Sequence, residues 1–139
     1  MSVSVPGEAT LQLGDQKATT RIKRVSLRKQ ADSEDQFSKA GKGQTFLTFE
    51  AEVQNNGKTD LALGGGYSLK VPGGKSLDYT GTADGGKAIL FDEPIPPGGK
   101  KQGTLTWEVP VPKKGQPYTL NWKPDPSGEK QARFTYKHQ

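Results

Sequence analysis

The sequence predicts an all-β domain built as a two-layer sandwich, and three observations support that prediction. Only 30% of the 139 residues are hydrophobic, as expected for strands that bury every second side chain. The 18 glycines and 10 prolines interrupt nearly every window that is long enough for a helix. Apolar and polar residues alternate with a period of two in about eight short segments bounded by turn residues, a pattern typical of a sandwich; a closed barrel is the main alternative.

The N-terminal part carries the less regular strand patterns. We expect one domain over residues 1–139, with its core within about residues 8–137. Leu11 and Leu13 predict a short opening strand. The next strand follows at residues 17–29, where the alternation slips by one residue between Lys23 and Arg24. A β-bulge absorbs such a slip, and we predict one at this point.

The middle of the chain combines a polar loop with the clearest strand. Residues 30–43 are rich in Ser, Asp, Gln and Gly, and they predict an exposed, mobile loop. Residues 45–55 alternate strictly, with Leu47 and Phe49 among the residues of the inward face. The Asn-Gly pair at residues 56–57 predicts a tight hairpin, because both residues tolerate a positive φ.

Shorter strands fill the rest of the chain. They are predicted at residues 67–71, 76–79, 88–91, 103–109, 118–123 and 132–137, with turns between them. Trp107 has the same parity as Leu105, and Trp122 has the same parity as Leu120. Both tryptophans therefore fall on the core side of their strands, which favours a packing role over a sugar-stacking platform.

Catalytic and metal-binding chemistry finds little support in the sequence. The chain has no cysteine, which excludes disulfides, thiolate metal sites and a cysteine nucleophile. The only histidine, His138, stands next to the last residue, and we predict that it lies in a disordered tail. One histidine provides neither a catalytic triad nor a multi-histidine metal site. We therefore expect no enzyme activity, no catalytic residue, no metal and no cofactor.

Two local motifs come close to known ligand sites without completing them. Residues 81–88 are similar to a phosphate-binding loop, but Ala88 stands where that loop requires Ser or Thr, so a glycine turn is the better interpretation. The acidic residues at 32–35 and 92–93 lack the spacing of a calcium loop and predict solvated loops. A carboxylate pair for glycoside hydrolysis is the weakest alternative, because nothing in the sequence selects such a pair.

The strand at residues 17–29 holds six basic residues and no acidic one. With the bulge in place, Arg21, Lys23, Arg24 and Arg28 point outward. One interpretation is that these four residues contact phosphates, anionic glycopolymers or an acidic partner. The other, which we favour, is that the charges keep an edge strand from pairing with another sheet. No aromatic residue is interleaved, so nucleic-acid binding is not expected.

The second half of the sequence contains the motifs of a known family. Phe49-x-x-x-Val53-x-Asn55-x-Gly57 is one of them, and a Pro-Pro-Gly-Gly turn before Leu105-Thr-Trp-Glu-Val-Pro110 is another. Over residues 18–137, the chain resembles the immunoglobulin-like domains of bacterial secreted antigens, mycobacterial ones included, and of lipid-anchored surface proteins. The resemblance implies an immunoglobulin-like antiparallel β-sandwich of about eight strands, export from a Gram-positive cell, and no catalytic residues.

The expected function is that of a non-catalytic interaction domain, secreted or at the cell surface, with a protein or cell-envelope partner. The alternative is a carbohydrate- or polyanion-binding module that uses the basic strand, in keeping with a net charge of +5. A hydrolase on a β scaffold comes last. No segment is long and apolar enough to cross a membrane. Residues 1–6 do not begin a signal peptide, so a cytoplasmic location stays open.

Overall fold

The structure, a computed structural model, describes residues 2–13, 16–28, 41–61, 67–78, 94–123 and 131–138. Within these residues the regular elements are all strands, and the predicted all-β class is confirmed. The strands are β1 (Ser2–Ser4), β2 (Gly7–Leu13), β3 (Gln16–Arg28), β4 (Gln44–Asn55), β5 (Tyr67–Lys70), β6 (Ser76–Asp78), β7 (Lys100–Pro110), β8 (Pro117–Trp122) and β9 (Ala132–Lys137).

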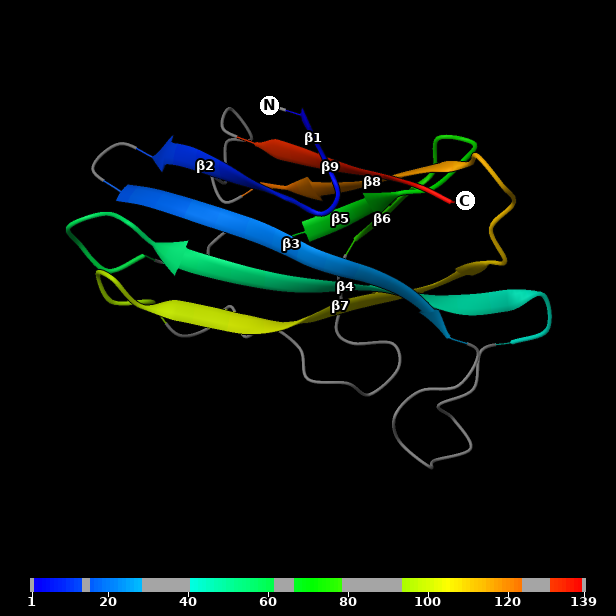
Figure 1. Cartoon of the computed structure of the whole chain (residues 1–139), viewed down its shortest axis with the longest axis horizontal. Coiled ribbons are helices and arrows are strands. Elements are labelled where there is room, and N and C mark those ends of the chain that lie inside the picture. The colour runs from blue at the N-terminus through cyan, green and yellow to red at the C-terminus, as the bar shows by residue number, and fades with distance from the viewer. Residues whose placement is uncertain are drawn as a thin grey trace.

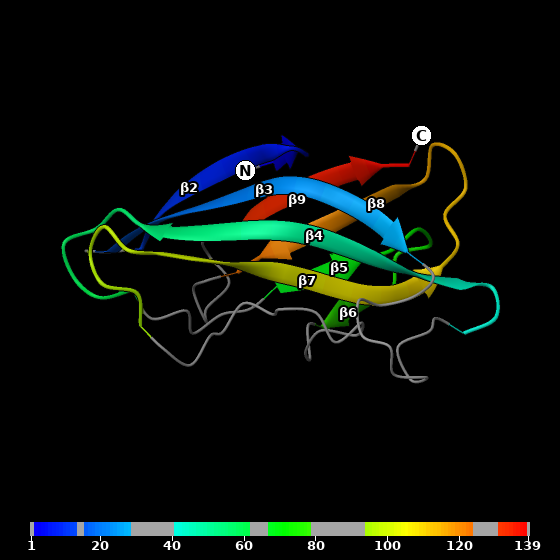
Figure 2. The ribbon, with the colours of Figure 1, turned by 60° about the horizontal axis from the view of Figure 1, so that its bottom comes forward.

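The described strands form two packed sheets, as Figures 1 and 2 show. One sheet has five strands in the order β1-β9-β8-β5-β6, and the other has four strands in the order β2-β3-β4-β7. The predicted sandwich is therefore confirmed. All strand pairs are antiparallel except β1 and β9, which run parallel. The parallel strand β1 was not predicted, because three residues are too few to show a period.

The core lies between the two sheets and is built from the inward positions of the longest strands. Leu47, Phe49 and Val53 of β4 are fully buried, as their alternation predicts. The rings of Phe49 and Trp107 meet edge to face, with their centroids 6.1 Å apart and their planes at 82°, an arrangement that aromatic pairs prefer. Trp122 is buried from the opposite sheet. The prediction that both tryptophans pack in the core is confirmed.

The predicted bulge is present in β3. Ile22 lies opposite Ala51 and Arg24 lies opposite Glu50, so Lys23 is the extra residue of β3. Because two residues of the bulged strand then lie opposite one residue of the neighbouring strand, the alternation of side chains along β3 shifts by one residue. Val25 and Leu27 thereby return to the side of the sheet that packs on the core. The slip in the sequence is thus explained by the register.

The predicted hairpin at residues 56–57 is wrong. The neighbours of β4 are β3 and β7, and the chain after Asn55 continues to Leu61, which forms a bridge with Ile95. The buried side chain of Asn55 holds this path: its Nδ2 donates to the carbonyl oxygens of Thr59 at 2.8 Å and of Ile95 at 2.7 Å. Its Oδ1 accepts from the amide of Gly57 at 2.9 Å. These bonds replace the hairpin.

The C-terminal segment also differs from the prediction, because His138 is not in a disordered tail. Its amide donates to the carbonyl of Gln116 at 3.1 Å, and its carbonyl accepts from the amide of Gly115 at 2.6 Å. Its Nδ1 lies 3.1 Å from the hydroxyl of Tyr136. A turn some twenty residues earlier in the chain therefore docks this segment, and no local pattern could have predicted that contact.

Several predictions fall outside the described residues. These are the strand at 88–91, most of the loop at 30–43, the glycine turn at 81–88 and the acidic segments at 32–35 and 92–93. In the described part of the chain, no helix is long and apolar enough to cross a membrane. The immunoglobulin-like character of the sandwich stays a prediction.

Candidate binding face around the bulge in β3

The outward side chains of the four-stranded sheet contain the four residues predicted to bind. The structure places Arg21, Lys23 and Arg24 side by side on this surface, around the bulge. Arg28 ends β3 opposite Phe46, and its side chain is outside the described part of the structure. We call the surface around the bulge the bulge face, and it consists of Glu8, Arg21, Lys23, Arg24, Glu50, Glu52, Gln102 and Thr104.

The position of β3 in the sheet limits the interpretation that we favoured to part of the strand. β3 lies between β2 and β4 and is an internal strand. However, β2 pairs only with residues 16–22 of β3, so Arg21 lies where both sides of the strand are paired and edge protection is not its role. Lys23, Arg24 and Arg28 lie beyond the last pair with β2, where β4 is the one described neighbour, so edge protection by these three residues stays a prediction. The edge strands of this sheet are β2 and β7, and residues 23–28 of β3 continue the border beyond the end of β2 in the described part of the chain.

The register between strands sets a carboxylate beside each described cation of the bulge face. Arg21 Nη2 lies 2.9 Å from Glu8 Oε2 of β2, and its Nε donates to the same oxygen at 3.1 Å. Arg24 Nε lies 2.8 Å from Glu50 Oε2 of β4. The hydrogen bond and the charge of Glu8 raise the pKa of Arg21 further above its ordinary value. Both arginines therefore carry their charge inside pairs.

The third pair, at the bulge itself, differs because its carboxylate is nearly buried. Lys23 Nζ lies 3.0 Å from Glu52 Oε2, and the side chain of Glu52 is only 8% exposed. Lys23 also donates to Oε1 of Gln102 at 3.2 Å. The hydrogen bond from Lys23 lowers the pKa of Glu52, against the opposing effect of burial, and the charges of Lys100 and Arg21 lower it further.

The sequence contains a signal for these partners, which becomes clear only when β3 and β4 are compared with each other. Glu50 and Glu52 alternate on the outward side of β4, and the predicted bulge sets Arg21 and Arg24 on the outward side of β3. Antiparallel pairing of the two most regular strands would have set unlike charges opposite each other, which is the favourable arrangement. Gln102 and Glu8 carry no comparable signal, because their contact with β3 depends on non-local register.

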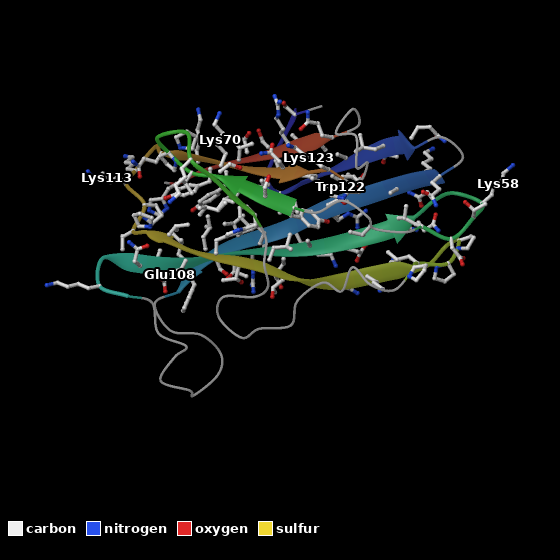
Figure 3. The ribbon with its side chains drawn as sticks, turned by 180° about the vertical axis from the view of Figure 1, so that it is seen from behind. Lys58, Lys70, Glu108, Lys113, Trp122 and Lys123 are labelled. Atoms are coloured by element: carbon white, nitrogen blue, oxygen red, sulfur yellow. The ribbon has the colours of Figure 1, made fainter. Side chains whose placement is uncertain are left out.

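The remaining described lysines are spread over other parts of the molecule. Lys58 and Lys113 project from opposite ends of the sandwich, and Lys70 and Lys123 lie on the five-stranded layer (Figure 3). None of these four takes part in an ion pair with another described residue. These four cations therefore lie away from the bulge face, where carboxylates accompany the cations.

Two shallow hollows flank Lys23. The first has a volume of about 390 Å³ and is lined by Lys23, Glu50, Ala51, Gln102, Gly103 and Thr104. The second has a volume of about 460 Å³ and is lined by Pro6, Gly7, Glu8, Arg21, Ile22 and Lys23. A bulge bends its strand and increases the local twist of the sheet. A depression in the surface on each side of the extra residue is therefore expected. The bulge face is thus uneven and polar.

The bulge face carries paired charges of both signs. A glycosidase needs one carboxylic acid whose pKa is raised so that it can donate a proton, and the pKa of Glu52 is lowered instead. Within the described residues, no three His, Cys, Asp or Glu side chains gather in a group that could hold a metal ion. What the face offers is fixed donors and acceptors in alternating charge.

The comparison with curated proteins gives no match. Three solved structures share the fold. The secreted protein MPT63 from Mycobacterium tuberculosis has 13% identity and a TM-score of 0.61, over 99% of this chain and 96% of that chain. An uncharacterized β-sandwich protein from Clostridium difficile 630 has 13% identity and a TM-score of 0.58, over 99% and 95%.

The third structure is a conserved hypothetical protein from Bacillus anthracis, with 17% identity and a TM-score of 0.59 over 81% of this chain and 89% of that chain. At these identities the likeness establishes the β-sandwich alone. The family model described as "Domain of unknown function (DUF4352)" matches residues 8–133, which include β2 except its first residue, all of β3 to β8 and most of the core. On that match, the chain belongs to the DUF4352 family of domains of unknown function.

Proposed function

We propose that this chain is a non-catalytic interaction domain, presented outside the cell, that docks a protein partner on the bulge face. The observation that carries the proposal is the Lys23–Glu52 pair, at 3.0 Å, with Gln102 bonded to the same ammonium at 3.2 Å. This cluster stands on the solvent side of the four-stranded sheet and is held from three neighbouring strands. Charges that are fixed before binding lose little side-chain entropy when a partner arrives.

The alternation of charge favours a protein as the partner. Interfaces between proteins gain specificity from complementary patterns of both signs. Polyanion binding instead depends on cations that neutralise phosphates or sulfates and release counterions. Arg21, Lys23 and Arg24 already have carboxylate partners, so an anionic polymer would compete with the carboxylates of the protein itself. The test below therefore distinguishes binding of a protein from binding of a polyanion.

One observation supports a location outside the cell. The fold is shared with a secreted protein of Mycobacterium tuberculosis.

The experiment is site-specific photo-cross-linking with envelope and culture fluid of the source organism. One variant carries a photoreactive residue in place of Gln102, at the bulge face, and a matched variant carries it in place of Arg133. Arg133 is exposed on β9 of the other sheet. The proposal expects a discrete protein adduct at position 102 that position 133 does not give, and that persists when the salt concentration is raised.

Two results would contradict the proposal. One is the same set of adducts at both positions, because the bulge face would then have no privileged role. The other is retention of an anionic polymer alone, released as salt screens the charges. That second result would assign Arg21 and Arg24 to a polyanion-binding module.

A further inference from the structure

The edge strands of the two sheets differ in how they are protected against pairing with another chain. Edge strands are commonly blunted by lysine, proline, bulges or shortness. β1 and β6 have three residues each. β7 begins with Lys100 and Lys101 and ends with Pro110. β2 has seven residues, Gly-Glu-Ala-Thr-Leu-Gln-Leu, with no lysine, arginine or proline among them.

In the described part of the chain, β2 pairs with β3 alone, and it forms the border of the four-stranded sheet in both ribbon views (Figures 1 and 2). β1 approaches it at Gly7, where an added Cβ would lie 2.5 Å from Val3 Cγ1 and 2.6 Å from the carbonyl oxygen of Ser4. The contact with β1 is therefore at the first residue of β2, and the strand continues beyond it.

The register shows which backbone groups of β2 point away from β3. The amide of Asn56 donates to the carbonyl of Lys17 at 2.8 Å, so the backbone groups of Lys17 point toward β4. Successive residues of a strand point their N–H and C=O groups to opposite sides. Ala18 and Thr20 therefore bond to β2, at Leu11 and Ala9 respectively.

It follows that Glu8 and Thr10 direct their N–H and C=O groups to the outer side of β2. The hydroxyls of Thr10 and Thr19 lie 2.8 Å apart, which agrees with a pair whose backbone groups do not bond to each other, since side chains are closest in such pairs. An antiparallel strand placed along this border would satisfy the backbone groups of both Glu8 and Thr10.

We propose that this border is a dimerisation edge, at which β2 of one copy pairs antiparallel with β2 of a second copy. The edge complements itself. If the two-fold axis passes at Ala9, Glu8 of each copy lies opposite Thr10 of the other; if it passes at Thr10, Glu8 lies opposite Gln12. Both of these residues are neutral, and the charge of Glu8 is paired with Arg21 of its own copy at 2.9 Å. A two-fold axis forms every hydrogen bond twice, and the two four-stranded sheets become continuous. This inference does not depend on the bulge face.

The occupant follows from the side chains of β2. A strand from an unrelated protein would be selected by pockets that receive its alternate side chains. The outward side chains along β2, Glu8 and Thr10, are already bonded to Arg21 and Thr19 of β3. Pairing along this border therefore depends on backbone hydrogen bonds and on the strand propensity of the added segment. A second copy of β2 provides both, and it has the same length as the border.

The test compares two substitutions at one position. Thr10→Pro removes the N–H that points outward and leaves the ladder with β3 unbroken, a site where proline is tolerated in edge strands. Thr10→Ala keeps that N–H and removes the bond to Thr19 only. Sedimentation equilibrium of the intact chain should show a dimer for the wild type and for Thr10→Ala. It should show association weakened by at least about tenfold for Thr10→Pro.

A covalent readout covers the case in which Thr10→Pro fails to fold. The natural chain has no cysteine, so Thr10→Cys introduces a single thiol that should form a linked dimer on mild oxidation, whereas Arg133→Cys on β9 should not. A wild type that sediments as a monomer at every concentration would overturn the proposal. Equal cross-linking of the two cysteine variants would overturn it as well.

Discussion

Lys23 is the extra residue of the bulge in β3, and its Nζ lies 3.0 Å from Oε2 of Glu52 on β4. The bulge therefore does more than restore the alternation of the core, because it sets an ammonium over a nearly buried carboxylate on the solvent side of the sheet. That pair joins β3 to β4, and Gln102 extends the contact to β7. We therefore expect both the stability of the sheet and the charge pattern of the bulge face to depend on this pair.

Removal of the cation should destabilise the domain more than removal of both charges. Lys23→Met leaves the carboxylate of Glu52 without its ammonium, and we expect a loss of about 1–2 kcal/mol in the free energy of unfolding, reduced by the partial exposure of Lys23. The double variant Lys23→Met/Glu52→Gln should recover part of that loss. Urea unfolding of the four members of the cycle measures the coupling, and strictly additive losses would mean that the pair contributes nothing.

The pair should also make stability depend on pH in the acid range. The pKa of Glu52 is lowered in the folded state from its ordinary value of 4.5. The stabilisation is therefore complete above about pH 4.5 and is lost as the pH falls toward the lower, folded-state pKa. We expect the difference in unfolding free energy between the wild type and Glu52→Gln to shrink on acidification through this range. A constant difference would show that Glu52 titrates normally.

The turn that replaces the predicted hairpin depends on the amide of Asn55. Asn55→Ala would remove the donor to the carbonyl of Thr59 and one of the two donors to the carbonyl of Ile95, which would keep its bond from the amide of Leu61 at 2.8 Å. It would also remove the acceptor of the Gly57 amide. We expect a loss of about 1.5–4 kcal/mol in unfolding free energy, since the side chain makes three hydrogen bonds and each contributes about 0.5–1.5 kcal/mol. Asn56→Ala, on the exposed neighbour, is the matched control in thermal unfolding. Equal effects of the two substitutions would contradict this role.

Trp107 should be a main contributor to the core. Its ring meets Phe49 edge to face, and the residue is buried. Trp107→Ala should cost about 3–5 kcal/mol, as removal of a buried aromatic side chain does. Val111, which is exposed, provides a control: Val111→Ala should change the unfolding free energy by less than about 0.5 kcal/mol. A loss below about 1 kcal/mol for Trp107→Ala would place its ring outside the core.

Much of the fold could be predicted from the sequence because its signals are local. Alternation along residues 45–55 identified β4 and its core face, and the phase slip near Lys23 identified the bulge. What failed depends on residues far apart in the chain. The hairpin after Asn55 is replaced through a bond to Ile95, and His138 is docked by the turn at Gly115. Such contacts require a register between strands that periodicity does not contain.

The same reasoning explains the outcome for the candidate site. The outward direction of Arg21, Lys23 and Arg24 follows from alternation, and the structure agrees. Their carboxylate partners lie on β2 and β4, so they become visible only once those strands are paired. A stripe of positive charge in one strand is thereby converted into a surface of mixed charge.

The most direct test of this account measures whether the carboxylates of Glu8 and Glu50 keep Arg21 and Arg24 from binding other anions. Glu8→Gln/Glu50→Gln removes the exposed carboxylate partners of Arg21 and Arg24 and leaves the Lys23–Glu52 pair intact. Binding of a polyphosphate chain at an ionic strength of about 0.15 M, followed by calorimetry, should be absent in the wild type and should appear in the double variant. Equally tight binding by the wild type would contradict the account, because its arginines would then be free to bind anions.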